Sequence, residues 1–84
     1  MVDYYREKYD FQDLQKVLIR LRQPDGCPWD AAQTHTSIRK DFLEEVYEVC
    51  EAIDRADNTL MCEELGDVLM QVVFHARIEE ELGR

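Results

Sequence analysis

Apolar residues recur along this chain every three to four positions, the period of an α-helix that turns one face toward a core. The first such stretch follows Asp10, a residue type that caps helices, and ends at the turn signal Pro24-Asp25-Gly26. Its apolar positions are Phe11, Leu14, Val17, Leu18 and Leu21. The pattern predicts a helix, followed by an irregular loop that includes residues 27–30.

The second apolar stretch predicts a longer helix, capped by Thr34 or Thr36 and running to about Ala56. Its apolar residues form two sets on the helix surface, so we expect it to be covered on two sides. One set is Ile38, Phe42, Val46, Val49 and Ile53, and the other is Leu43, Tyr47 and Cys50.

The third stretch predicts a helix from about Leu60 to Leu82, after a break at residues 57–59, with Gly83 suited to its C-terminal cap. The expected inward positions are Leu65, Val68, Leu69, Val72, Val73 and Ala76. Because no strand pattern and no repeat occurs, the predicted fold is all-α, an antiparallel helical bundle. We treat residues 1–84 as a single domain.

The length of 84 residues makes the core marginal, since a chain this short buries only roughly 60 % of its unfolded surface. Oligomerisation is the natural remedy, and we expect at least a homodimer, as a dimer or a tetramer. The polar start from Met1 to Asp10 does not resemble a signal peptide, and every apolar run is shorter than the ~20 residues of a membrane span. We therefore expect a cytoplasmic protein with no membrane partner.

The charge balance is acidic, with 19 Asp and Glu against 10 Lys and Arg and a net charge of −9. This disfavours a nucleic-acid partner, because binding to the phosphate backbone needs a basic surface. Three cysteines without a C-x-x-C pair argue against a disulfide framework or a zinc site. We expect Cys50 and Cys62 to be small buried apolar residues.

Two clusters of acids carry most of the functional signal. Glu45 and Glu64 each interrupt an apolar stripe, and Glu48 and Asp67 follow them at i+3, on the same helix face. A solvated face is the ordinary reading of helical acids, as we expect for residues 79–81. A carboxylate inside an apolar stripe is costly unless it is paired, however, and ligands that are all oxygen favour Mg²⁺ or Mn²⁺.

Other carboxylate sites fit less well. Di-iron bundles need a Glu-x-x-His motif, and Val72 stands three residues before His75. The calcium loop of EF-hands is also absent from the sequence. Gly66 costs helix propensity, and we expect it to allow a close approach of two helices beside the site.

At these residues the chain resembles the MazG family of nucleoside triphosphate pyrophosphohydrolases. The resemblance covers nearly everything from about Tyr9 onward. The matching segments are 21–30, with its Gly-Cys-Pro-Trp-Asp, 33–35, 44–48, 64–67 and 71–76. It implies an α-helical, Mg²⁺-dependent fold that is active as a dimer. It also implies cleavage between the α and β phosphates, which gives a nucleoside monophosphate and pyrophosphate.

The resemblance also implies roles for individual residues. Glu45, Glu48, Glu64 and Asp67 would be the Mg²⁺ ligands, and Glu44 would position or deprotonate the attacking water. Family members continue past a position like Arg84 into a further helix, so we expect a truncated domain or part of a longer protein.

Trp29 and His35 are the candidate substrate-binding residues. The Trp29 ring could stack on a base or plug the end of the following helix, and His35 is better suited to a cap or a loop hydrogen bond than to catalysis. Arg39 and Lys40 fit surface charge better than phosphate contacts, and we expect His75 to be a satisfied core or interface residue. The competing function is a non-catalytic helical module for dimerisation or regulation that keeps the fold and the metal.

Overall fold

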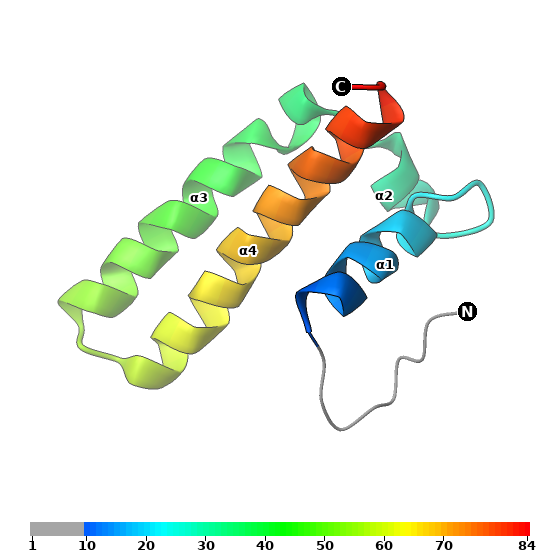
Figure 1. The fold of residues 1–84 in the computed structure, drawn as a ribbon. Coiled ribbons are helices and arrows are strands. Elements are labelled where there is room, and N and C mark those ends of the chain that lie inside the picture. Colours follow the sequence, from blue (N-terminus) through cyan, green and yellow to red (C-terminus); the bar gives the residue numbers. More distant parts are fainter. Residues whose placement is uncertain (1–9) are drawn as a thin grey trace.

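The computed structural model describes residues 10–84, which form four helices and no strand. The helices are α1 (Phe11–Leu21), α2 (Pro28–Ala32), α3 (His35–Asp54) and α4 (Asn58–Glu81). α3 and α4 form a long antiparallel hairpin, and α1 lies along α4 on the side away from α3 (Figure 1). The predicted all-α class is therefore confirmed for this part of the chain.

The helix starts follow local capping rules. The Asp10 side chain accepts a hydrogen bond from the Asp13 N–H, and Asp13 accepts one from the Asp10 N–H, both at 2.9 Å. Thr34 and Ser37 form the same reciprocal pair at the start of α3, which decides between the two predicted threonine caps. Asp57 caps α4 by accepting from the Leu60 N–H at 3.0 Å.

The expectation of an irregular loop at residues 27–30 is wrong, because Pro28 begins the short helix α2. Proline suits the first helical position, where its missing N–H would have no partner. The turn before it needs Gly26, since a Cβ there would overlap the carbonyl oxygens of Arg20 and Leu21. The end of α1 is thereby folded tightly against α2.

The core is centred on α4, which packs against both α3 and α1, in the half of the hairpin away from its connecting turn. Its buried residues are Leu18, Ile38, Val73, Phe74 and Ile78, with Leu14 packed against them. Among the expected inward positions of α4, Val73 is buried, whereas Leu65, Leu69, Val72 and Ala76 are exposed. Those four positions were predicted wrongly because α1 covers a different side of α4.

The second face of α3 is not covered within one chain, so the expected cover on two sides would need a second copy. Leu43, Val46, Tyr47 and Ile53 are exposed, and so are Cys50 and Cys62, which we expected to be buried. A Cβ at Gly66 would meet nothing within 4 Å, so this glycine does not mark a close helix approach. These errors share one cause: helical periodicity does not tell whether a partner helix lies against a face.

Most exposed apolar residues of the hairpin fall in one stripe on each helix, and Met70 on α4 lies outside it. The stripes are Leu43, Val46, Tyr47, Cys50 and Ile53 on α3, and Cys62, Leu65, Leu69, Val72 and Ala76 on α4. Because two antiparallel neighbours are related by a two-fold rotation, this spacing puts both stripes on the same broad side of the hairpin. We call this side the apolar face. A hollow of about 280 Å³ lies on it, lined by Arg39, Phe42, Leu43 and Val46.

Candidate metal centre

Four carboxylates converge in the seam between α3 and α4. One oxygen each from Glu45, Glu48, Glu64 and Asp67 can be chosen so that all four lie within 4.8 Å of one another. The i+3 spacing aligns the two acids on each helix, and the antiparallel hairpin sets the two pairs opposite each other. The structure thus brings together the four residues that the sequence singles out. We call this group the acid quartet.

The acid quartet is partly withdrawn from water. Glu45 and Glu64 lie in the seam, and each has an oxygen, Oε2, that is shielded from solvent and has no hydrogen-bond partner among the described residues. Glu48 and Asp67 are exposed, and helical spacing turns them toward the side opposite the apolar face. A shielded carboxylate oxygen without a partner is costly, and a cation would satisfy it.

The electrostatics point the same way. The pKa of Glu64 is raised to about 7, first by its hydrogen bond with Glu48, then by burial and by the charges of Glu48, Asp67 and Glu45. The pKa of Glu45 is also raised, mainly by burial and then by Glu48 and Asp67. Near neutral pH, a proton on Glu64 therefore does part of what a bound cation would do.

The donor set fits a hard divalent cation. All four groups offer carboxylate oxygens, and neither His nor Cys takes part in the quartet. Mg²⁺ and Mn²⁺ prefer such ligands and keep some coordination positions for water or phosphate. An exposed side formed by Glu48 and Asp67 would leave room for those further ligands.

Glu44, the candidate for water activation, stands beside the acid quartet rather than in it. It is exposed and lies one helical turn from Glu48, and its carboxylate is 3.8 Å from the Lys40 ammonium. This weak surface pair leaves Glu44 open to solvent.

The two candidate substrate-binding residues lie elsewhere. Trp29 stands on α2 with 60 % of its surface exposed, so it does not plug a helix end. His35 begins α3, and its Nδ1 lies 2.7 Å from Nδ1 of His75. Ten residues of helix separate His35 from Glu45, about 15 Å along the axis. The structure does not bring these two residues together with the acid quartet.

Two acids near the end of α4 are not the plain solvated charges that we expected. Glu79 pairs with Arg84 at 2.8 Å, which is the main reason that its pKa is lowered. Glu81 accepts a two-pronged contact from Arg22, at 2.8 and 2.9 Å, and its pKa is lowered for that reason. Only Glu80 in this run keeps the expected exposure without an ion pair among the described residues.

Arg22 is the structural residue that sequence reasoning missed. Its side chain is 7 % exposed, and Nη1 donates to the carbonyls of Asp30 and Gln33 at 2.7 and 3.0 Å. With the Glu81 contact, it joins the end of α1, the middle and the C-terminal cap of α2, and the end of α4. Its place in the Leu-Arg-Gln-Pro-Asp-Gly segment was the only signal for it in the sequence.

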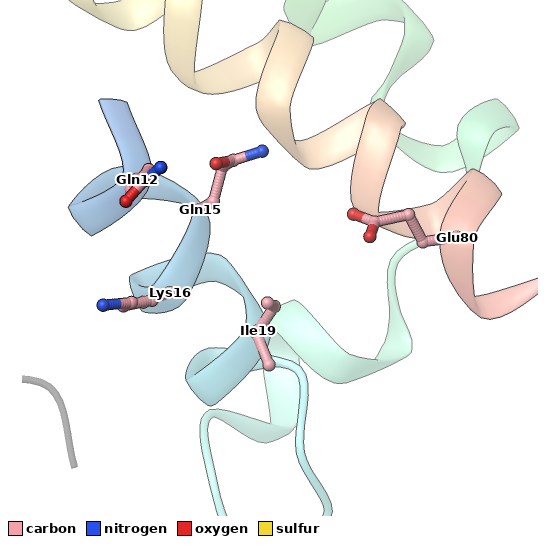
Figure 2. Close-up of a pocket in the computed structure, with 5 residues that line it drawn as sticks. All are labelled: Gln12, Gln15, Lys16, Ile19 and Glu80. Atoms are coloured by element: carbon pink, nitrogen blue, oxygen red, sulfur yellow. The ribbon is translucent and has the colours of Figure 1, made fainter. Parts of the chain in front are cut away.

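A separate hollow of about 310 Å³ lies between α1 and α4 (Figure 2). Glu80 from α4 lines it, and the other lining residues are Gln12, Gln15, Lys16 and Ile19 from α1. It contains no group of acids or histidines that could hold a metal. The acid quartet is therefore the stronger candidate site in residues 10–84.

Comparison with known proteins identifies the family of this chain. Residues 33–84 match the family described as the MazG nucleotide pyrophosphohydrolase domain. The chain is 52 % identical over 73 residues to the nucleoside triphosphate pyrophosphohydrolase/pyrophosphatase MazG of Thermotoga maritima, covering 87 % of this chain and 29 % of that protein. It is 50 % identical over 72 residues to the nucleoside triphosphate pyrophosphohydrolase of Escherichia coli K12, covering 84 % and 27 %.

A third relative is the uncharacterized protein YabN of Bacillus subtilis, 49 % identical over 75 residues, covering 89 % of this chain and 15 % of that protein. The chain belongs to the MazG nucleotide pyrophosphohydrolase domain family. It spans less than a third of the length of these relatives. None of the helices in residues 10–84 has the length and apolarity to traverse a bilayer.

Proposed function

We propose that this domain hydrolyses nucleoside triphosphates between the α and β phosphates, releasing a nucleoside monophosphate and pyrophosphate, with Mg²⁺ held by the acid quartet. The observation that carries the proposal is the convergence of four carboxylates from α3 and α4, two of them with shielded, unpartnered oxygens. The names of relatives at about 50 % identity support the reaction class.

The proposed role of each acid follows from its position. Glu45 and Glu64, in the seam, would fix the cation, and Glu48 and Asp67 would complete its ligands on the open side. A bound divalent ion would supply charge neutralisation at the phosphates and a lowered pKa for a coordinated water. Four carboxylates carry enough charge for two such ions when substrate phosphates share them.

Glu44 would hold the attacking water or take its proton. Its exposed carboxylate is one turn from Glu48, on the solvent side of the quartet, where a water could approach the α phosphorus. Trp29 would stack on the nucleobase, and its large exposed ring makes it available for that contact. His35 is the weaker substrate contact, since its Nδ1 is engaged by His75.

The active assembly would be a homodimer or a tetramer. The apolar face exposes Tyr47, Ile53 and Leu65 by 66, 57 and 51 %, a large apolar surface for an 84-residue chain. A second copy is the natural cover, since a two-fold axis would set like stripes against each other. Light scattering at micromolar concentration should give at least twice the chain mass. Leu69→Arg should lower that mass while leaving the fold intact.

We propose a cytoplasmic site of action, where nucleoside triphosphates are available, with no nucleic-acid partner for so acidic a chain. The test is a panel of ribo- and deoxyribonucleoside triphosphates with Mg²⁺, with the products separated. Monophosphate and pyrophosphate are expected. Diphosphate with free phosphate would contradict the assignment, and metal binding without any turnover would favour the non-catalytic helical module.

A further inference from the structure

His35 and His75 face each other edge to edge. Their Nδ1 atoms are 2.7 Å apart, and their ring planes differ by 2° with centroids 5.0 Å apart. A centroid distance this much longer than the N···N distance means that the rings lie end to end rather than face to face. The geometry is that of an N–H···N hydrogen bond, in which one ring donates and the other accepts.

The pair bridges the two long helices and is partly covered, with the His35 side chain 37 % exposed. The Phe42 ring lies 5.4 Å from that of His75, and Nε2 of His75 is shielded from solvent without a partner among the described residues. Nε2 of His35 lies 3.8 Å from Glu79, which Arg84 holds in turn. Burial, and then the charge of His35, lower the pKa of His75, so the neutral ring that this hydrogen bond needs is favoured.

The pair lies at the open end of the α3–α4 hairpin. The connecting turn joins α3 to α4 covalently at one end, and His35 is the first residue of α3, at the other end (Figure 1). The acid quartet lies between these two points. Between the quartet and His75, Oε1 of Gln71 is shielded and has no partner in the part of the chain that the structure describes.

We propose that His35 and His75 are positioning residues whose hydrogen bond closes the open end of the hairpin and holds the two carboxylate pairs in register for the cation. The inference rests on the proposed metal role of the acid quartet. Metal-free carboxylates repel and push α3 from α4. The core, in which Ile38 packs with Phe74 and Ile78, opposes this push, and the histidine hydrogen bond adds a directional contact between the two helices. The hydrogen bond between His35 and His75 keeps the four carboxylates organised before the cation binds.

The test compares two replacements of one residue. His75→Leu removes the hydrogen bond and keeps an apolar side chain. His75→Asn puts an amide at about the place of the Nδ1 atom and can still bond to His35. Binding of Mn²⁺ to the whole chain would be measured by paramagnetic resonance or calorimetry. We expect His75→Leu to raise the Kd roughly three- to tenfold, the size typical of residues that couple to a site without touching its ligand. His75→Asn should restore most of the affinity.

A matched control separates positioning from general loss of stability. Ile78→Val removes one methylene from the buried core one turn beyond His75, so it should lower the melting temperature without changing the Kd for Mn²⁺. His35→Leu, on the opposite helix, should reproduce the loss seen with His75→Leu and covers the case in which that variant does not fold. Scalar coupling between the two Nδ1 nuclei in a nitrogen-15 spectrum should report the bond directly.

The outcomes are distinguishable. A wild-type chain that binds no Mn²⁺ would overturn the proposed function together with this inference. Wild-type binding with an unchanged Kd in both leucine variants, or no coupling between the two nitrogens, would overturn the positioning role alone. An equal loss in His75→Asn and Ile78→Val would also count against it, because destabilisation would then explain the effect.

Discussion

The two halves of the α3–α4 hairpin differ in how well their side chains are buried and paired within the chain. Away from the turn, α1 packs against α4, Leu18 and Ile38 are 1 % exposed, and Arg22 binds Glu81 and two backbone carbonyls. Toward the turn no third helix of residues 10–84 lies against the hairpin, and the acid quartet gathers like charges in the seam (Figure 1). The first half therefore holds the buried core and the buried Arg22 contacts, whereas the second holds the unpaired carboxylates.

The difference indicates that one half of the hairpin stabilises the fold and the other half binds partners. A region that lacks partners for its carboxylates and its apolar side chains gains most when partners arrive, which is what a cation and a second copy would provide. The packed half pays the conformational cost of ordering the hairpin and can do so without ligands. The predictions below are ordered from the largest expected effect to the smallest.

Glu64→Gln should have the largest effect. It keeps the size of the side chain and removes one ligand charge, so we expect turnover of nucleoside triphosphate with Mg²⁺ to fall by more than about 1,000-fold, or more than about 4 kcal/mol in the barrier. The rise in melting temperature with Mg²⁺ should weaken as well. Glu80→Gln, on an exposed acid of the same helix, should leave both unchanged. Comparable losses in the two variants would mean that the quartet is not the metal site.

Leucine truncation should distinguish the two halves directly. Leu18→Ala empties a fully buried site and should lower the free energy of unfolding by roughly 3 kcal/mol, as measured by urea denaturation. Leu65→Ala, with the same chemistry at 51 % exposure, should cost less than about 1 kcal/mol in the dilute chain. In a dimer its cost should grow with protein concentration. Equal losses at low concentration would show that the turn half is packed in the single chain.

Arg22→Met should cost about 2 kcal/mol of unfolding free energy, because it removes the buried guanidinium from two backbone carbonyls and leaves Glu81 only its ion pair with Arg77 at 3.2 Å. The comparison is Arg20→Met, whose ion pair with Asp25 is exposed on both sides and should be worth less than about 0.5 kcal/mol. Both can be read from the midpoint of chemical unfolding. If the two variants lose the same free energy of unfolding, the hydrogen bonds and ion pair of Arg22 contribute no more than an exposed ion pair does.

The smallest effect concerns pH. The pKa of Glu64 is about 7 in the folded chain, above the usual 4.5, so the folded state binds this proton more tightly than the unfolded one. The resulting stability is complete below about 4.5 and is lost as the pH rises through 7. The metal-free protein should therefore become more stable as the pH falls from 7.5 to 5. The lowered pKa of His75 acts in the opposite direction, so the wild type is compared with Glu64→Gln.

Saturating Mg²⁺ should flatten this pH dependence, because the cation removes the repulsion that favours the proton. Thermal unfolding from pH 5 to 7.5, with and without Mg²⁺, measures both effects. A wild-type curve that stays parallel to that of Glu64→Gln throughout would show that Glu64 has an ordinary pKa.

Local features could be read from the sequence. The caps at Asp10 and Asp57 depend on side chains and backbone within three residues, and the acid pairs depend on the pitch of one helix. The meeting of those pairs followed from one further step, a short turn that makes neighbouring helices antiparallel. The fold class and the four acids were accessible for this reason. The short helix α2 was missed because residues 27–30 carry no helical period.

What only the tertiary structure decided is which faces find partners. The apolar spacing of Val73 and of Leu69 is the same kind of signal, yet Val73 is buried and Leu69 is 42 % exposed. Arg22 bonds to Glu81, which is 59 positions away in the sequence, and His35 bonds to His75, which is 40 positions away. Periodicity records the direction of a side chain on its own helix, whereas burial depends on the length and placement of the other helices. The sequence by itself therefore determined α1, α3, α4 and the acid quartet, and packing determined which half of the hairpin is closed and which is left open to bind.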